Sequence, residues 1–161
     1  MTRDRELLLH FLAAIAYRTQ KALRDAPASY PDFVAGHAAR TPVEILRHMT
    51  SLMGYTATFF RGGSYPMVPD SLPTFDAEVQ RFHEQLADVG DLIRAGTPPC
   101  TISTEQLLQG PLADTMTHVG QLALLRRLAE SPVPSENFIF AEVRADRLGV
   151  DQAPPARPDP A

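Results

Sequence analysis

Hydrophobic residues recur at helical spacing along four long segments of the chain. In residues 3–25, and again in the segment that follows Pro42, apolar side chains return every three or four positions, the pattern of an amphipathic helix. The pattern is most regular in residues 75–95, and a fourth segment opens at Gly110-Pro111 and runs to about residue 130. Four amphipathic helices of about five turns each predict an all-α fold, a four-helix bundle.

Local signals mark where these helices begin and end. Thr41-Pro42-Val43-Glu44 combines an N-cap threonine, a proline at the first helical position and a capping-box acid. Ser103-Thr104-Glu105-Gln106 offers a second capping box for a short turn before the last helix. Pro27 ends the first helix, while Gly62-Gly63 and Gly96 release the backbone after the second and third.

The C-terminal part of the chain has no long helical pattern. Residues 136–143 are rich in apolar side chains and fit either a strand or a short helix, because periodicity does not separate the two in so short a run. Residues 151–161 contain four prolines and predict an extended or disordered tail. We therefore expect one bundle domain over residues 1–150, followed by an irregular extension.

Composition narrows the classes of function. A chain of 161 residues fits one domain, and its net charge of −4 with a pI near 5.7 argues against nucleic acid as a partner. Cys100 is the only cysteine, so an intrachain disulfide is excluded and a reducing compartment is favoured. We find neither the pattern of a signal peptide nor an apolar run long enough for a membrane span, and we expect a cytoplasmic protein without a membrane partner.

Three residues offer the chemistry of a metal site. His48 lies on the apolar stripe of the second helix, and Asp114 and His118 are four residues apart on the inward face of the fourth, so these last two project side by side. Two imidazoles and a carboxylate suit Zn, Ni or Fe(II), and three protein ligands leave coordination positions open for water or substrate.

Each of these residues also has a purely structural interpretation. His48 fits a hydrogen-bonded core histidine, and Asp114 fits a carboxylate stabilised by the dipole at a helix N-terminus. Asp114 and His118 could simply bond each other. Two neighbours extend the pattern: Gln121 could orient a ligand or lie on the surface, and Gly120 is explained by close approach of a neighbouring backbone.

Other chemistries are less well supported. Lys21, the only lysine, falls on a helix surface by phase, which argues against Schiff-base catalysis. Cys100 is interpreted as an incidental thiol, and Arg126-Arg127 as cations that complement a helix C-terminus. The remaining histidines have no partner at ligand spacing, and one of them, His83, is expected on a solvated face; they are His10, His37 and His83.

The sequence around the three candidate ligands resembles the DinB-like (damage-inducible, YfiT-related) four-helix-bundle superfamily. That family shows a histidine in helix two, here within Glu44-Ile45-Leu46-Arg47-His48-Met49, and a later His-x-x-x-His-x-Gly-Gln run. The corresponding run here is Asp114-Thr115-Met116-Thr117-His118-Val119-Gly120-Gln121, in which Asp114 replaces the first histidine. The resemblance covers nearly the whole chain in helix order, but its motif is short.

The resemblance implies a bundle, often a homodimer, that holds a divalent metal through three side chains, here His48, Asp114 and His118. Some members of the family are thiol transferases or isomerases that use low-molecular-weight thiols, and others are classed as hydrolases. We therefore expect a metal-dependent enzyme acting on a small electrophile by thiol transfer or hydrolysis, with no general base identified. The rival hypothesis is a non-catalytic dimeric bundle whose metal site is structural or vestigial, or a protein that binds a small molecule.

Overall fold

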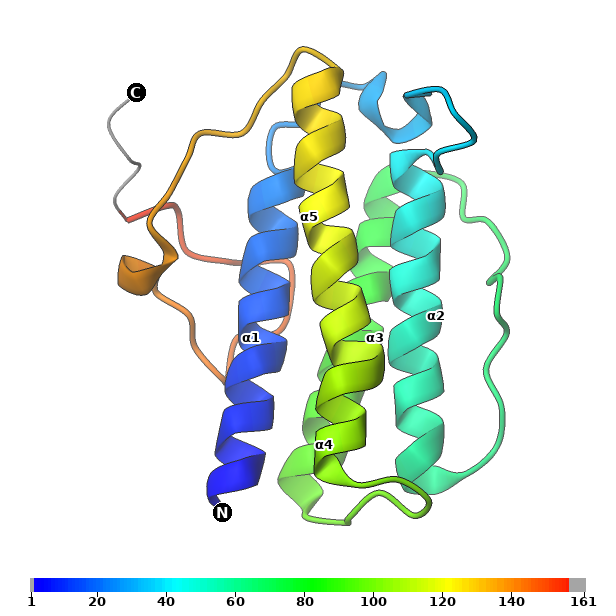
Figure 1. The fold of residues 1–161 in the computed structure, drawn as a ribbon, viewed down its shortest axis with the longest axis vertical. Coiled ribbons are helices and arrows are strands. Elements are labelled where there is room, and N and C mark those ends of the chain that lie inside the picture. Colours follow the sequence, from blue (N-terminus) through cyan, green and yellow to red (C-terminus); the bar gives the residue numbers. More distant parts are fainter. Residues whose placement is uncertain (1, 157–161) are drawn as a thin grey trace.

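Four long helices packed side by side form the body of the molecule (Figure 1). The computed structural model describes residues 2–156, and no β-strand occurs among them. The long helices are α1 (Arg3–Leu23), α2 (Pro42–Arg61), α3 (Phe75–Ala95) and α5 (Ala113–Leu128). The short ones are the 3₁₀ turns Tyr30–Asp32 and Phe138–Phe140, α4 (Thr104–Leu107) and a π-helical turn, Leu108–Leu112. The predicted all-α four-helix bundle is confirmed.

The helices are not a simple up-and-down series. In Figure 1 α1 and α5 run in one direction and α2 and α3 in the other, so the loop of residues 62–74 must return along the length of the bundle. Two ion pairs fit this parallel arrangement of α2 and α3: Arg47 Nε lies 2.7 Å from Glu78 Oε1, and Arg61 Nη2 lies 2.7 Å from Asp88 Oδ2. Because α2 is antiparallel to α5, residues near the middle of each helix can face one another.

The predicted helix caps are present. Thr41 Oγ1 accepts from the Glu44 amide, while the Thr41 amide donates to Glu44 Oε2 at 2.8 Å. Ser103 and Gln106 form the same reciprocal pair at the start of α4. These bonds satisfy backbone donors that the first turn of a helix leaves without partners. Gly96 ends α3 with φ of +86°, a left-handed conformation that favours glycine.

The apolar stripes of all four long helices meet in one core. Helix α1 ends at Leu23, two residues earlier than its sequence pattern indicates. Each long helix contributes side chains with no exposed surface, among them Leu12, Met49, Phe82 and Leu122. Among residues 2–156, no helix is both long and apolar enough to cross a membrane.

Arg126 links the C-terminal ends of α1 and α5. Its guanidinium is buried and donates to the carbonyl of Ala22 at 3.0 Å, the carbonyl of Arg24 at 2.9 Å and the carbonyl of Ser131 at 2.8 Å. The carbonyls of Ala22 and Arg24 lie at the end of α1, which leaves them without intrahelical partners. Arg126 therefore caps a neighbouring helix, a role that the sequence interpretation, which considered only the dipole of its own helix, missed.

The segment after α5 folds back along the bundle and crosses α1 (Figure 1). Residues 136–143 contain only the 3₁₀ turn Phe138–Phe140, which settles the strand-or-helix alternative. Glu136 is buried and accepts hydrogen bonds from Tyr17 Oη at 2.5 Å and from Lys21 Nζ at 2.8 Å. The expectation of a surface Lys21 is thus wrong, because the returning segment covers that face of α1 and neutralises the ammonium group.

A second correction concerns His83. It is only 1% exposed, because residues 145–152 cover this part of α3, and its ring bonds the Leu148 carbonyl at 2.7 Å and Gln20 Nε2 at 3.0 Å. The predicted solvated face is therefore wrong. Residues 151–156 have no regular structure, as expected, but Gln152 is buried and its amide donates to the carbonyls of Arg147 and Gly149. The rest of the predicted tail, residues 157–161, lies outside the described residues.

Candidate metal centre

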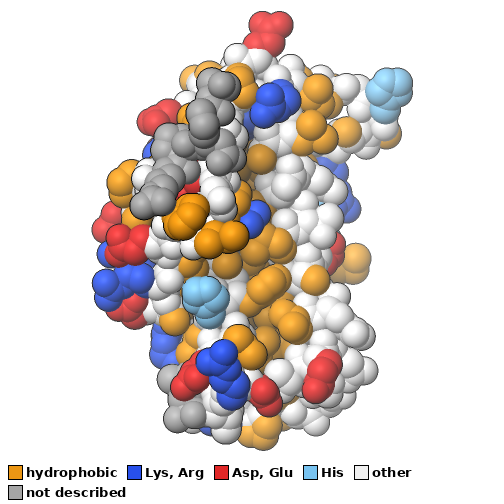
Figure 2. All heavy atoms as spheres, turned by 60° about the vertical axis from the view of Figure 1, so that its left-hand side comes forward, with side chains coloured by type: hydrophobic (Ala, Val, Ile, Leu, Met, Phe, Trp, Pro, Cys, Tyr) orange, Lys and Arg blue, Asp and Glu red, His pale blue; other side chains and the backbone are white. Residues whose placement is uncertain are grey.

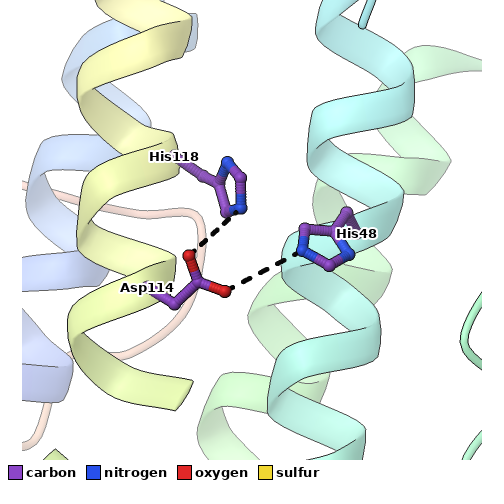
Figure 3. Close-up of side chains that lie close together, drawn as sticks. All are labelled: His48, Asp114 and His118. Carbon is purple, nitrogen blue, oxygen red and sulfur yellow. Dashed lines mark ion pairs between the residues drawn. The ribbon is translucent and has the colours of Figure 1, made fainter. Parts of the chain in front are cut away.

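The three predicted ligands converge between α2 and α5. Figure 3 shows His48 on α2 and Asp114 and His118 on α5, all directed into the space between the two helices. One donor atom from each residue lies within 4.8 Å of the others, and this is the one such group of three or more among residues 2–156. The sequence pattern thus identified residues that the fold brings together.

The carboxylate of Asp114 turns one oxygen toward each of the two imidazoles. Its Oδ1 is 3.4 Å from His118 Nε2, and its Oδ2 is 3.9 Å from His48 Nε2 (Figure 3). The two rings meet edge to face, with centroids 4.8 Å apart and planes at 86°. The side chains are 10% exposed for His118, 30% for His48 and 49% for Asp114, so the cluster opens to solvent on the Asp114 side.

Gln121 fixes the tautomer of His118. The Nδ1 of His118 lies 2.8 Å from Gln121 Oε1. An amide oxygen only accepts hydrogen bonds, so Nδ1 carries a proton, and in the neutral ring Nε2 then holds the lone pair, on the side of Asp114. This is the arrangement in which a histidine ligand is held by a partner on its other nitrogen. Gln121 therefore contacts the imidazole of His118, and its role in orienting a metal ligand stays a prediction.

His48 is held in its neutral form. Burial lowers the pKa of the imidazole, the guanidinium of Arg40 and the neighbouring ring of His118 lower it further, and Asp114 acts in the opposite direction. Because only the neutral ring has a free lone pair, an imidazole in this environment is available as a ligand at neutral pH.

A break in the helix precedes Asp114. Gly110 has φ −88° and ψ −108°, outside the helical region, and Pro111 follows it within the π-helical turn Leu108–Leu112. Proline provides no amide hydrogen, so the ladder of helical hydrogen bonds is interrupted there, and Thr115 Oγ1 donates to the Pro111 carbonyl at 2.8 Å. Regular α-helix begins only at Ala113, which places Asp114 in the first turn of α5.

Two hollows flank the cluster. One, of about 500 Å³, includes Asp114 and is lined by aromatic and aliphatic side chains such as Tyr55, Phe59 and Ile102. The other, of about 330 Å³, includes His48 and is lined by three charged side chains, Arg40, Glu44 and Arg47, of which Arg47 pairs with Glu78. A small molecule bound in either hollow would therefore reach one of the three candidate ligands.

The other residues considered at the sequence level do not join the cluster. Among the described residues, His10, His37 and Cys100 belong to no group of metal-type donors. The explanation of Gly120 by close backbone approach is wrong: a Cβ built there would meet no atom within 4 Å. Gly120 lies on a different side of α5, beside a separate cavity.

Comparisons with known proteins identify no relative of this chain: no protein-family model matches it, and neither the curated proteins nor the solved structures contain a significant match. The evidence for the fold and for the cluster therefore comes from this structure alone. The resemblance to the DinB-like superfamily remains a prediction.

Proposed function

We propose that His48, Asp114 and His118 bind one divalent transition-metal ion, and that the protein is a metal-dependent enzyme acting on a small electrophile. The single observation that carries the proposal is the convergence of two imidazoles and a carboxylate from two helices. One donor atom from each residue lies within 4.8 Å of the others. Two histidines and one acid are a common ligand set for Zn and for non-haem Fe(II).

The residues fit such an ion with small adjustments. Metal–ligand bonds of 2.0–2.2 Å place the donors of a tetrahedral site about 3.4 Å apart. Asp114 Oδ1 already lies at this distance from His118 Nε2, whereas His48 Nε2 lies 3.9 Å from the other oxygen, Oδ2. With one donor atom taken from each residue, the three lie within 4.8 Å of one another. Rotation of the exposed Asp114 side chain and of the half-buried His48 ring would close the remaining gap. His118, which Gln121 holds, provides the fixed point.

A cation at such a site lowers the pKa of a bound water or thiol and so provides a strong nucleophile at neutral pH. The chain itself contributes the open side of the cluster and two hollows in which reactants can lie. The aromatic hollow at Asp114 suits an apolar electrophile. The hollow at His48, with Arg40 at its rim, suits a thiol that carries a carboxylate. On this basis thiol transfer is preferred over hydrolysis, and DinB-like membership remains part of the proposal.

The first experiment is elemental analysis of protein purified without a His-tag, followed by calorimetric titration of the metal-free protein with Zn²⁺. We expect about one ion per chain, and loss of binding in His118→Ala and in His48→Ala. His10→Ala is the matched control, since His10 lies on α1 away from the cluster.

Catalysis is tested separately, with 1-chloro-2,4-dinitrobenzene and a panel of low-molecular-weight thiols, and with p-nitrophenyl acetate for hydrolysis. Metal-dependent turnover that His118→Ala abolishes, while its helical circular dichroism is retained, would support the enzyme. Stoichiometric metal without turnover on either substrate class would favour the structural metal site of the rival hypothesis. Absence of metal from the wild-type protein would overturn the proposal.

A further inference from the structure

A cavity separate from the metal cluster and from its two flanking hollows lies between α1, α5 and residues 133–138 of the returning segment. Its volume is about 340 Å³, within the range of about 300–1,000 Å³ for small-molecule sites. On α5 it is lined by Val119 and, farther around the helix, by residues 116, 120, 123 and 127. With 3.6 residues per turn, these four positions lie about half a turn around the helix from Asp114 and His118. The cavity and the cluster therefore occupy opposite sides of α5.

The charged side chains of the cavity do not balance. Four of them line it: Arg18, Lys21, Arg127 and Glu136. Glu136 is bonded to Lys21 Nζ at 2.8 Å, so one anion and one cation cancel. Two guanidinium groups are left over, and neither takes part in an ion pair or hydrogen bond among residues 2–156.

Among residues 2–156, the guanidinium of Arg18 contacts an aromatic ring and has no hydrogen-bond partner. Its guanidinium carbon lies 3.7 Å above the centre of the Phe138 ring, and Phe138 in turn packs edge to face on Tyr17. Burial lowers the pKa of Arg18, and the Glu136 charge opposes this change. A partly desolvated guanidinium whose N–H groups are unpaired is a strong site for an oxyanion, because it offers up to two parallel hydrogen bonds.

Gly120 supplies an independent observation. A glycine in the middle of a helix costs about 1 kcal/mol relative to alanine. No neighbouring backbone approaches it, since a Cβ at this position would meet nothing within 4 Å. The missing side chain instead keeps the wall of the cavity open, with the apolar Met116 and Ala123 beside it.

We propose that this cavity is a binding site for a small organic anion, whose oxyanion group pairs with Arg18 and Arg127 and whose apolar part lies on α5 over Gly120. Figure 2 brings this side of the molecule forward and shows basic side chains beside hydrophobic ones. Carboxylates and phosphate esters share the required oxyanion. The site does not depend on the metal cluster, so it can be tested apart from the proposed enzyme activity.

The experiment is a titration of ¹⁵N-labelled full-length protein with 4-phenylbutyrate, with phenyl phosphate, and with the neutral analogue 4-phenylbutanamide. The Gly120 amide, identified by its loss in Gly120→Leu, reports on the site in the other proteins, and the amides of Met116 and Ala123, which also line the cavity, report on it in Gly120→Leu. We expect saturable shifts of this amide with at least one anion, and an affinity for 4-phenylbutanamide about tenfold weaker than for 4-phenylbutyrate. A preference between the two anions identifies the oxyanion class.

Variants separate binding from folding. Gly120→Leu fills the cavity while raising helix propensity, so the melting temperature should stay the same or rise while anion binding is lost. Thr117→Leu adds the same side chain outside the cavity and should bind normally. Arg127→Met should weaken binding about tenfold, whereas Arg3→Met, which removes a distant surface cation, should not.

Three results would overturn the site. They are unchanged binding in Gly120→Leu, equal affinity for the neutral amide, and no saturable shift of Gly120 with either anion. His118→Ala should keep anion binding, because it removes a residue on the other face of α5. Loss of binding in that folded variant would likewise contradict a site independent of the metal cluster.

Discussion

At the scale of single residues, two side chains outside the ligand set control the imidazoles. Gln121 holds His118 in one tautomer through a 2.8 Å hydrogen bond, and Arg40 helps to keep His48 neutral. Neither residue would be found by searching for metal donors, because an amide and a guanidinium are not typical ligands. Gln121 was noticed as the neighbour of Gly120 at the end of the run Asp114 to Gln121, and it lies one helical turn after His118 on the same face.

Replacing Gln121 by leucine should weaken Zn²⁺ binding by about tenfold to a hundredfold, because the imidazole loses the partner that fixes its tautomer and orientation. The melting temperature of the metal-free protein should change little, since Gln121 is exposed. Calorimetric titration measures the first quantity and thermal unfolding the second. Gln80→Leu, at an exposed position of α3, is the matched control; equal affinities in the two variants would contradict a role for Gln121.

Asp114→Asn should also weaken metal binding, because it replaces an anionic donor by a neutral amide while preserving size. Asp114→His should retain binding, since it restores the histidine found at this place in the motif that the sequence resembles. The measurement is the zinc content of untagged protein. Full zinc occupancy in both Asp114→Asn and Asp114→Ala would show that the carboxylate is not a ligand.

At the scale of helices and segments, caps and one buried ion pair define the elements. The capping box at Thr41 starts α2 and thereby sets the phase in which His48 faces α5. We expect Thr41→Ala to cost about 1 kcal/mol of unfolding free energy, which lowers the melting temperature by about 2–4 °C in a protein of this size. Thermal unfolding measures this change. Thr117→Ala is the control, because Thr117 is exposed and has no capping role. Identical melting temperatures for the two variants would contradict a stabilising role for the Thr41 cap.

The returning segment is anchored on α1 by Glu136. Burial alone would raise the pKa of Glu136, but the hydrogen bonds from Lys21 and Tyr17 lower it, so the carboxylate is ionised. Glu136→Leu should therefore destabilise the protein by about 3 kcal/mol, because it leaves the Lys21 ammonium, only 9% exposed, without its anion.

The double variant Lys21→Met/Glu136→Leu should recover much of this loss, since no unpaired charge then remains buried. Urea denaturation of both single variants and the double variant forms the required cycle. A double variant as unstable as the sum of the single variants would show that the pair does not act as a unit.

At the scale of the whole molecule, His83 couples stability to pH. Burial lowers its pKa, and the hydrogen bond to the Leu148 carbonyl acts in the opposite direction. In the neutral ring Nδ1 donates to that carbonyl and Nε2 accepts from the Gln20 amide, so both nitrogens are satisfied. Protonation would place an N–H of His83 against the N–H₂ of Gln20.

The unfolded state binds a proton on His83 more readily than the folded state does. The stabilisation that neutral His83 gives to the folded state is therefore complete above the unfolded pKa of about 6.5, and it is lost as pH falls through the lower pKa of the folded state. Urea unfolding of metal-free protein between about pH 5 and 8 should show this decline. The decline should be smaller in His83→Gln. Both proteins should carry His48→Ala, which removes the other histidine with a lowered pKa. The same pH dependence in both would assign the effect to other groups.

The fold was accessible from the sequence because its helices are amphipathic over many turns and are bounded by strong local signals. The capping boxes at Thr41 and Ser103 and the left-handed Gly96 are properties of a few neighbouring residues, so they can be recognised without a structure. The π-helical turn before α5 could not be predicted in this way. Gly110-Pro111 indicated only the start of a helix. A π-helical turn holds one residue more than an α-helical turn, and this extra residue depends on how α4 and α5 pack.

The errors share one cause. This holds for His83 and Lys21, which were assigned from helical phase and are each buried by a segment distant in sequence. Phase tells which side of a helix a residue occupies, but not what covers that side. Irregular segments carry no periodic signal, so the path of residues 129–156 over α1 and α3 was not predictable.

The sequence by itself determined the four helices, their boundaries to within a few residues and the shared face of Asp114 and His118, because these depend on interactions within a few residues. Only the tertiary structure decided that His48 lies beside that pair, that Gln121 fixes His118, and that a cationic cavity exists behind α5. Those features depend on the rotation and spacing of helices relative to one another. Rotation and spacing are set by the packing of many side chains at once, which no local pattern encodes.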